Sequence, residues 1–202
     1  MTNYTMPTRP GFRSADFYLE TNTGIYQSPV NKAVQRMERS GALWQAVYTL
    51  PAMKRADAMV WKAFFLKLKG RVHTFSAYDP ECAQPRGVAT GTPLVKGAGQ
   101  TGNTLLIDGC TASTFGWLMA GDYFSCEGQL HQLTQDADTN GSGETTLVFE
   151  PPRRSSPADN AAIVTDKPSC KMIMLDDSTG SWPSDAMGVY QEKTFTAMEV
   201  IS

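Results

Sequence analysis

Residues 43–70 read LWQAVYTLPAMKRADAMVWKAFFLKLKG, and two patterns in this stretch decide the fold. From Trp44 to Leu50, apolar side chains return at every second position, and this period of two predicts a strand. After Pro51, apolar residues return every three or four positions, which predicts a helix at about residues 53–69. Because the sequence shows no second helix of comparable strength, the chain is predicted to be mainly β with one main α-helix.

The segment before this stretch is predicted to supply a partner for the first strand. Ser40-Gly41 has the composition of a turn, so residues 33–39 and 43–50 are predicted to pair as a β-hairpin. The first thirty residues are rich in Thr, Asn, Pro and Gly. They are predicted to form an irregular arm with a short strand near residues 17–19.

After the helix, the sequence changes to short apolar pieces separated by turn residues. Glycines and prolines punctuate residues 81–102, and Pro151-Pro152 ends the region. Short strands about ten residues apart, with turn chemistry between them, favour a small β-barrel or sandwich. The predicted strands are at residues 104–107, 117–119, 123–126, 129–134 and 145–149.

These patterns predict an outer domain that is interrupted by an insert. The outer domain, a β-sandwich or barrel with the helix, comprises residues 1–79 and 156–202. The inserted small β-barrel comprises residues 80–155. Residues 153–170 are rich in Ser, Asp, Ala and Pro and are interpreted as a returning linker. Strand patterns return at residues 170–175 and 193–201.

The net charge of −2 gives no sign of nucleic-acid or anionic-membrane binding, but the charge is unevenly spread. Residues 51–75 hold six basic residues and one acidic residue, a net +5. Residues 76–202 hold seven basic and sixteen acidic residues, a net −9. The basic balance therefore belongs to the helix, and the acidic balance belongs to the insert and the last part of the chain.

Cysteine and histidine are too few and too dispersed to predict a metal site. Cys82, Cys110, Cys126 and Cys170 include no CxxC pair, so we expect no metal, no cofactor and four reduced, mostly buried thiols. The N-terminal residues lack a signal-peptide pattern, and no apolar run of about 18 residues occurs. We therefore expect a soluble chain, made in a reducing compartment and without a membrane partner.

An acidic turn is the most tempting candidate for a chemical site. Asp136-x-Asp138-x-Asn140-Gly141 opens like the calcium-binding loop of an EF-hand, whose twelfth residue is a bidentate glutamate. Here the twelfth residue is Leu147, and the flanking segments are strand-like. A tight turn between two strands is therefore preferred over a calcium site.

Two further patterns have little chemical content. GAGQTG at residues 97–102 matches GxGxxG as a string, but a strand-like segment follows where the dinucleotide fingerprint needs a helix. His73 and His131 lie in different predicted strands, and the chain has no G-x-S-x-G nucleophile elbow. We therefore predict no catalytic residue, and a hydrolase that uses His73 or His131 is kept only as an alternative.

Several segments, taken together in order, resemble one family over nearly the full chain. They begin with the strand at 44–50, KRADAMVWKAFFLKLKGR at 54–71, Phe75 and Asp79-Pro80. The insert follows with GQTGNTL at 99–105 and LMAGDYF at 118–124, and then PPRR at 151–154 and an aromatic final strand at 195–200. This arrangement resembles the distal tail proteins of bacteriophages with long, non-contractile tails.

The resemblance implies a structural virion protein and not an enzyme. Distal tail proteins form a hexameric ring that joins the tail tube to the hub or baseplate. The ring surrounds the channel for the tape measure protein and for DNA in transit. The resemblance thus implies a homo-oligomer at the tail tip of the virion, assembled in the host cytoplasm. It also implies a tube-like β-barrel or sandwich with a flanking helix, and an extra β-domain that is sometimes of the oligonucleotide/oligosaccharide-binding type.

The uneven charge suits a ring, because a closed ring joins two different patches of each subunit. The basic helix and the acidic remainder of the chain supply opposite charges for such a contact. The competing interpretation is an ordinary solvated helix face. The candidate contact residues toward a neighbouring subunit, the tube or the hub are Lys54, Arg55, Lys62, Lys67, Arg71, Asp176 and Asp177.

Two other functions stay open at this point. In the first, the chain is a carbohydrate- or receptor-binding module of the tail tip, with Trp117 and Tyr123 as candidate surface aromatics of the insert. Core packing is the commoner use of such residues. In the second, the chain is a tail tube or tail-completion protein. A tube protein should polymerise into long cylinders, whereas a distal ring should stop at one or two layers.

Overall fold

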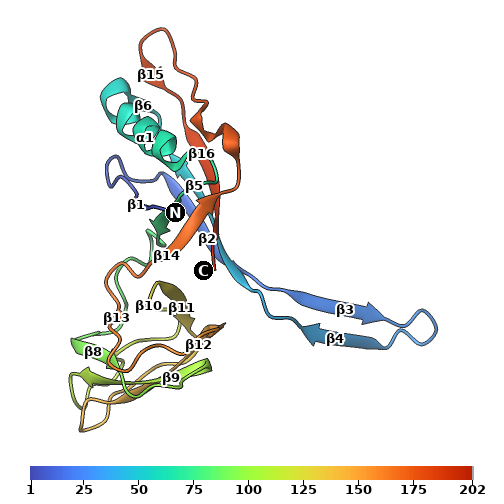
Figure 1. The fold of residues 1–202 in the computed structure, drawn as a ribbon, viewed down its shortest axis with the longest axis vertical. Helices are drawn as coiled ribbons and strands as arrows, with labels where there is room; N and C mark the ends of the chain where they lie inside the picture. Colours follow the sequence, from blue (N-terminus) through green and yellow to red (C-terminus); the bar gives the residue numbers. More distant parts are fainter. Residues whose placement is uncertain (202) are drawn as a thin grey trace.

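The computed structural model describes residues 1–201, which form two six-stranded sheets, a projecting hairpin and one α-helix (Figure 1). The predicted fold class, mainly β with one main helix, is confirmed. The first sheet contains β1 (Asn3–Thr5), β2 (Ser14–Glu20), β5 (Leu43–Leu50), β7 (Thr74–Ala77), β14 (Cys170–Met174) and β16 (Lys193–Glu199). The second sheet contains β8 (Gly91–Val95), β9 (Gly102–Cys110), β10 (Tyr123–Cys126), β11 (Gln129–Leu133), β12 (Thr145–Arg153) and β13 (Ile163–Val164). The remaining elements are β3 (Thr23–Gln27), β4 (Val34–Glu38), β6 (Met53–Lys54), α1 (Arg55–Leu68), the 3-10 helix η1 (Asp177–Gly180) and β15 (Val189–Tyr190).

The first sheet has the strand order β1-β7-β14-β16-β5-β2. Along β5, half-buried and buried residues alternate over the whole strand, as the period of two predicted. In β16, Phe195, Ala197 and Glu199 are buried on one face. Phe195 lies opposite Tyr48 and Ala197 lies opposite Ala46, so the apolar faces of the two strands are in register.

The helix α1 packs against the core of the first sheet, and its limits are close to the predicted ones. The Trp61 ring lies 6.1 Å from that of Phe195, and the Phe65 ring lies 5.3 Å from it. Aromatic pairs of this kind contribute about 0.5–1.5 kcal/mol each beyond the area that they bury. Lys69 ends the helix in the left-handed conformation, with φ 50°, and donates its N–H to the Leu66 carbonyl.

The second sheet has the strand order β13-β10-β11-β12-β9-β8 and nearly closes into a barrel. Val95 of β8 donates its N–H to the Ala161 carbonyl, and Asn160 donates to the Val95 carbonyl, both at 2.9 Å. These bonds place the segment before β13 against β8 and leave little free edge. The fully buried side chains inside the barrel include Leu105, Ile107, Trp117, Leu118, Phe124, Leu147 and Phe149.

The barrel is inserted between two paired strands of the first sheet. β7 and β14 run antiparallel, with Ala77 opposite Cys170, and the chain between them builds the barrel. β13 belongs to the barrel sheet, which therefore extends beyond residue 155, where the insert was expected to end. The segment interpreted as a linker thus contributes a strand.

Aromatic packing joins the barrel to the first sheet. The Tyr123 ring of β10 lies 5.4 Å from the ring of Trp44 in β5 and 6.1 Å from that of Phe17 in β2. Trp44 Nε1 donates a hydrogen bond to the Leu130 carbonyl of β11 at 2.9 Å. Tyr123 and Leu130 consequently pack in the core of the first sheet, although both lie in barrel strands.

The two strands β3 and β4 form a hairpin that projects from the first sheet on the side away from α1 (Figure 1). Because β2 pairs with β5 and β3 pairs with β4, one long two-stranded ribbon leads from the sheet into the hairpin. The predicted pairing of residues 33–39 with 43–50 is wrong, since these segments follow one another along the ribbon. Gly41, with φ 115°, and the hydrogen bond from Asn22 Nδ2 to the Ser40 carbonyl mark a bend between them.

One predicted barrel strand is also wrong. Residues 117–119 make an isolated bridge, between Leu118 and Ala137, and form no named strand. Their apolar character reflects the burial of Trp117 and Leu118 in the barrel core. Burial and strand pairing give the same signal in so short a segment.

Candidate interaction surfaces

Four of the predicted contact residues, Lys54, Arg55, Lys62 and Lys67, lie on or beside α1. Lys54, Arg55 and Lys67 are exposed. Lys62 is half-buried, and its Nζ lies 5.3 Å from the centre of the Tyr190 ring in β15, within the range of a cation–π contact. Lys62 is therefore engaged within its own subunit, whereas Arg55 and Lys67 present their charge to solvent.

The remaining predicted contact residues, Arg71, Asp176 and Asp177, lie together near the C-terminal end of α1. Arg71 Nε lies 3.8 Å from Asp177 Oδ1, and both side chains are more than half exposed, so this pair adds little stability. Asp176 accepts hydrogen bonds from the backbone nitrogen and Oγ of Ser178, and these bonds lower the pKa of Asp176. The two aspartates thus share a surface with the basic residues and do not form the separate acidic patch that a ring contact needs.

The outward face of α1 is apolar, which the sequence analysis did not predict. Met59, Val60 and Leu66 are 36%, 52% and 72% exposed. Met59 and Leu66 are seven residues apart, two helical turns, and therefore lie on the same side. The signal was present in the sequence, because apolar residues occur all around this helix. The rest of the protein packs against one side of α1. The opposite side is exposed to solvent, with Arg55 near one end of it and Lys67 near the other.

The aromatics predicted for carbohydrate binding are buried, so this prediction of a surface site is wrong. Trp117 is 0% exposed, and its Nε1 donates to the Thr90 carbonyl at 2.8 Å. Tyr123 is 6% exposed and packs against Trp44 at the junction of the barrel and the first sheet. Both side chains fill cores because a large aromatic ring buries much apolar surface.

The β3–β4 hairpin exposes apolar side chains on both faces. Ile25 and Arg36 lie opposite each other on one face, and Gly24 and Met37 lie opposite each other on the other face. The exposed fractions are 72% for Ile25, 62% for Tyr26, 92% for Val30, 51% for Val34 and 57% for Met37. An isolated two-stranded hairpin is only marginally stable in water, and exposed apolar surface of this kind marks interaction sites.

A groove of about 880 Å³ separates the base of the hairpin from the barrel. Its walls include Leu19, Ile25 and Met37 on one side and Pro151 and Pro152 on the other. The hairpin is therefore not packed against its own barrel. Arg154 of the barrel nevertheless reaches the sheet at the base of the hairpin, where its Nη2 donates to the Ala42 carbonyl.

A second exposed apolar surface lies at the end of the barrel where β9 stops and β12 begins. Phe115 is 86% exposed and Val88 is 57% exposed, and Val88 donates its N–H to the Gly116 carbonyl at 3.1 Å. Thr114 and Gly116 donate their N–H groups to the side chains of Thr139 and Asp138 at 2.8 and 2.7 Å. Phe115 is thus held outward between two fixed neighbours. We call Val88, Phe115, Asp136 and Asp138 the barrel-end patch.

The acidic run that contains Asp136 and Asp138 lies in the connection between β11 and β12, and the predicted tight turn is confined to residues 140–143 of that connection. Asp136 Oδ1 accepts the Ala120 N–H and Asp138 Oδ1 accepts the Gly116 N–H, both at 2.7 Å. These carboxylates fasten loops of the barrel. Within residues 1–201, no group of three or more His, Cys, Asp or Glu side chains could hold a metal ion.

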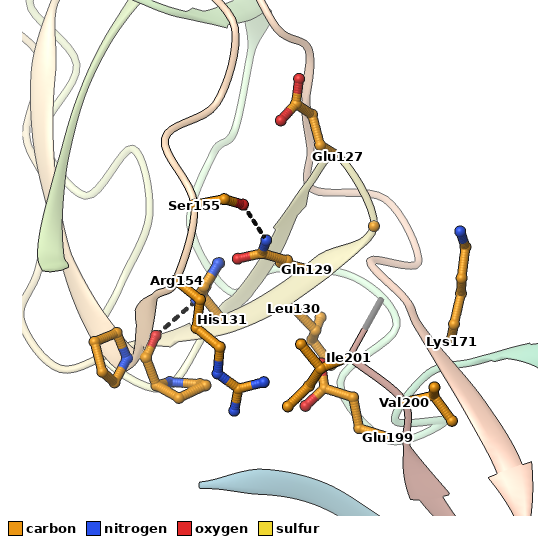
Figure 2. Close-up of a pocket in the computed structure, with 13 residues that line it drawn as sticks. Glu127, Gln129, Leu130, His131, Arg154, Ser155, Lys171, Glu199, Val200 and Ile201 are labelled. Atoms are coloured by element: carbon orange, nitrogen blue, oxygen red, sulfur yellow. Dashed lines mark hydrogen bonds between the residues drawn. The ribbon is translucent and has the colours of Figure 1, made fainter. Parts of the chain in front are cut away.

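A smaller pocket of about 170 Å³ lies where the barrel meets the first sheet (Figure 2). The barrel contributes Gln129 and Arg154, and β14 and β16 contribute Lys171 and Glu199. Burial raises the pKa of Glu199, while the N–H of Trp44 donates to its carboxylate and opposes that rise. The pocket therefore carries both signs of charge and favours no single class of ligand.

The two histidines, which were considered as catalytic alternatives, lie in different parts of the fold. His131 is buried in the barrel, where its Nδ1 lies 2.8 Å from the Pro151 carbonyl and so carries the ring proton. Burial lowers the pKa of His131 to about 3. His73 precedes β7 of the first sheet, and its Nδ1 accepts the N–H of Thr2 at 3.3 Å. The histidines thus share no site.

Arg153 is the buried charge beside His131. Its Nη1 lies 3.4 Å from His131 Nε2, and its Nη2 lies 4.0 Å from Glu127 Oε2. Among the described residues, Nε and Nη2 of Arg153 find no hydrogen-bond partner. The cysteines behave as small buried groups: all four are free thiols, three are buried, and Cys82 is half-buried.

Comparison of the chain with models of known protein families and with curated proteins finds no match. Among residues 1–201, no helix combines the length and the apolar character needed to cross a membrane.

Proposed function

We propose that the protein is a structural component of a bacteriophage tail tip, a distal tail protein that forms a six-fold ring between the tail tube and the hub or baseplate. The resemblance of the sequence over nearly the full chain supports this function. The architecture supports it too, because a sheet with a flanking helix and an inserted barrel is the plan expected of that family. The tape measure protein and the DNA would pass through the ring.

The observation that carries the proposal is the exposed β3–β4 hairpin. It leaves the first sheet on the side away from α1 (Figure 1). Its apolar residues are exposed and not covered by the rest of the chain. Full burial of one large apolar side chain contributes about 1.5–3 kcal/mol. Several such residues can offset the cost of association, which is about 4–15 kcal/mol. A neighbouring copy is the partner that a closed ring would supply.

The outward face of α1 is a second uncovered surface, and it suits the other partners of a tail ring. Met59 and Leu66 lie there between the cationic Arg55 and Lys67. We assign this face to the tail tube or the hub, whose contacting surface should then be apolar with an acidic rim.

The test is the assembly state of the purified protein, by native mass spectrometry and negative-stain imaging. The wild type should form a closed ring of six, alone or on a tail-tip partner. A variant in which a short Gly-Ser turn replaces residues 23–38 should remain a folded monomer. A wild type that stays monomeric under every condition would contradict the proposal, and long cylinders would point to a tail tube protein instead.

The carbohydrate-binding alternative has lost its candidate residues, since Trp117 and Tyr123 are buried. Glycan-array binding by the wild-type protein, together with a monomeric state, would restore that alternative.

A further inference from the structure

The charge of the hairpin indicates which surface of a neighbouring copy could bind it. The hairpin and its base carry Lys32, Arg36 and Arg39 against one acid, Glu38. The outward face of α1 is flanked by basic residues, so a hairpin docked there would bring like charges together. Like charges in contact oppose association by several kcal/mol when water is excluded. The outward face of α1 is therefore a poor receiver for this hairpin.

The barrel-end patch carries the negative charge that complements the basic hairpin. Asp136 and Asp138 supply negative charge beside the exposed Phe115 and Val88. The nearby Arg86 does not cancel this charge, because its Nε lies 3.5 Å from the buried Asp122. An exposed aromatic residue that is held in place beside a complementary charge is typical of the anchor residues of protein interfaces.

The hairpin points away from the barrel of its own subunit (Figure 1). β12 begins at Thr145, next to the acidic turn, and ends at Arg153, which lines the groove beside the hairpin base. At about 3.3 Å per residue, the strand separates these two ends by roughly 26 Å. The hairpin base therefore lies beside the Arg153 end of β12, whereas the loop that carries Phe115 follows the end of β9 that pairs near Thr145. A hairpin with this direction meets the patch of another copy and not its own.

We propose that the β3–β4 hairpin of one copy docks on the barrel-end patch of the next copy. This inference rests on the proposed ring and names its intersubunit contact. Each copy gives a hairpin at one end and receives one at the other, which is the head-to-tail arrangement that closes into a ring. Phe115 and Val88 pack against exposed apolar side chains of the hairpin, and Asp136 and Asp138 face its arginines and lysine.

Site-directed crosslinking of the full chain tests the contact. Val30→Cys at the hairpin tip and Ala112→Cys beside the patch are made separately in a Cys82→Ser background, where the remaining thiols are buried. A short bismaleimide should join the two variants when they are mixed and should give only background product with either variant alone. The matched control replaces Ala112→Cys with Ala63→Cys on the exposed side of α1 and should stay at background.

A second pair of variants tests the anchor. Phe115→Ser should weaken assembly by about tenfold or more, whereas Val164→Ser, which removes another exposed apolar side chain of the barrel, should leave assembly unchanged. Higher salt should also weaken assembly, because the contact pairs opposite charges.

The outcomes separate this inference from the proposed function. An intact ring that crosslinks through Ala63→Cys, or through neither position, would overturn the inference and leave the ring standing. Crosslinks through Ala112→Cys in open oligomers that never close would support the inference and contradict the ring. A chain that stays monomeric and uncrosslinked would overturn both.

Discussion

His131 makes the stability of the barrel depend on pH. Its folded-state pKa of about 3 lies well below the ordinary value for histidine, so between these values the unfolded chain binds a proton that the folded chain does not. The stability is therefore complete above about pH 6.5 and falls as the pH decreases, by up to about 1.4 kcal/mol per pH unit.

Replacing this residue should remove that dependence. In His131→Asn, the amide can still donate to the Pro151 carbonyl but does not titrate. Urea unfolding at pH 7 and pH 5 should show a smaller loss of unfolding free energy for the variant than for the wild type. Carboxylates titrate in both proteins, so the difference between the two isolates the histidine. Equal losses would show that His131 becomes protonated without unfolding the barrel.

Single functional residues were the hardest feature to predict from the sequence. Trp117 and Tyr123 were chosen because exposed aromatics bind sugars, but composition does not reveal which aromatics fill a core. Phe115, two residues before Trp117, gave no periodic signal and was not selected. Its exposure follows from the hydrogen bonds that fix Thr114 and Gly116, and these depend on a turn more than twenty residues away.

At the scale of elements, the C-terminal end of α1 offers a direct test of helix capping. Lys69 adopts the left-handed conformation, which costs about 1 kcal/mol for a residue with a side chain and almost nothing for glycine. Lys69→Gly should therefore raise the unfolding free energy by about 0.5–1 kcal/mol. Lys67→Gly, inside the last turn, removes the same charge and should lower it by about 1 kcal/mol. Thermal and urea unfolding measure both, and a loss in Lys69→Gly would contradict the capping argument.

Elements with a strong local pattern could be predicted, and those defined by distant partners could not. The alternation in β5 and the spacing in α1 are properties of consecutive residues, so both elements were found near their observed limits. β8 contains Gly91 and Pro93, and β13 is only two residues long, so neither has a clear local pattern, and both exist because they close the barrel against each other. β4 was predicted as a strand but with the wrong partner, since it pairs with β3 and not with β5. The prediction failed because a glycine at a bend gives the same sequence signal as a glycine in a chain reversal.

At the scale of the whole molecule, the junction between the barrel and the first sheet should couple their unfolding. Tyr123 is a barrel residue that packs in the other core, against Trp44 and Phe17. Tyr123→Ala should lower the unfolding free energy by about 3–5 kcal/mol, the usual cost of truncating a buried aromatic residue. It should also split one thermal transition into two, since each sheet keeps most of its own core. Tyr18→Ala, on the more exposed side of β2, is the control. It should change neither the unfolding free energy nor the number of thermal transitions. A single, unshifted transition in Tyr123→Ala would show that the junction is not a coupling point.

The overall plan of an interrupted sheet domain with an inserted barrel could be predicted from the order of patterns along the chain. The projecting hairpin and the apolar outward side of α1 could not. A strand or helix that is apolar on both faces gives the same sequence signal whether its second face meets its own chain or another molecule. The exposed apolar surfaces were therefore not predicted as surfaces.

The pairing of β7 with β14 has an evolutionary consequence. The barrel starts after Ala77 and returns at Cys170, and these residues are direct neighbours across two strands. A single genetic event could add, remove or exchange the whole barrel without shifting the register of any strand in the first sheet. Loss of the barrel would remove the two partners of Trp44, because its ring packs against Tyr123 and its Nε1 donates to the Leu130 carbonyl. Homologues that lost the barrel should therefore carry a smaller or more polar residue at the position of Trp44, as the mark of a module that was once attached.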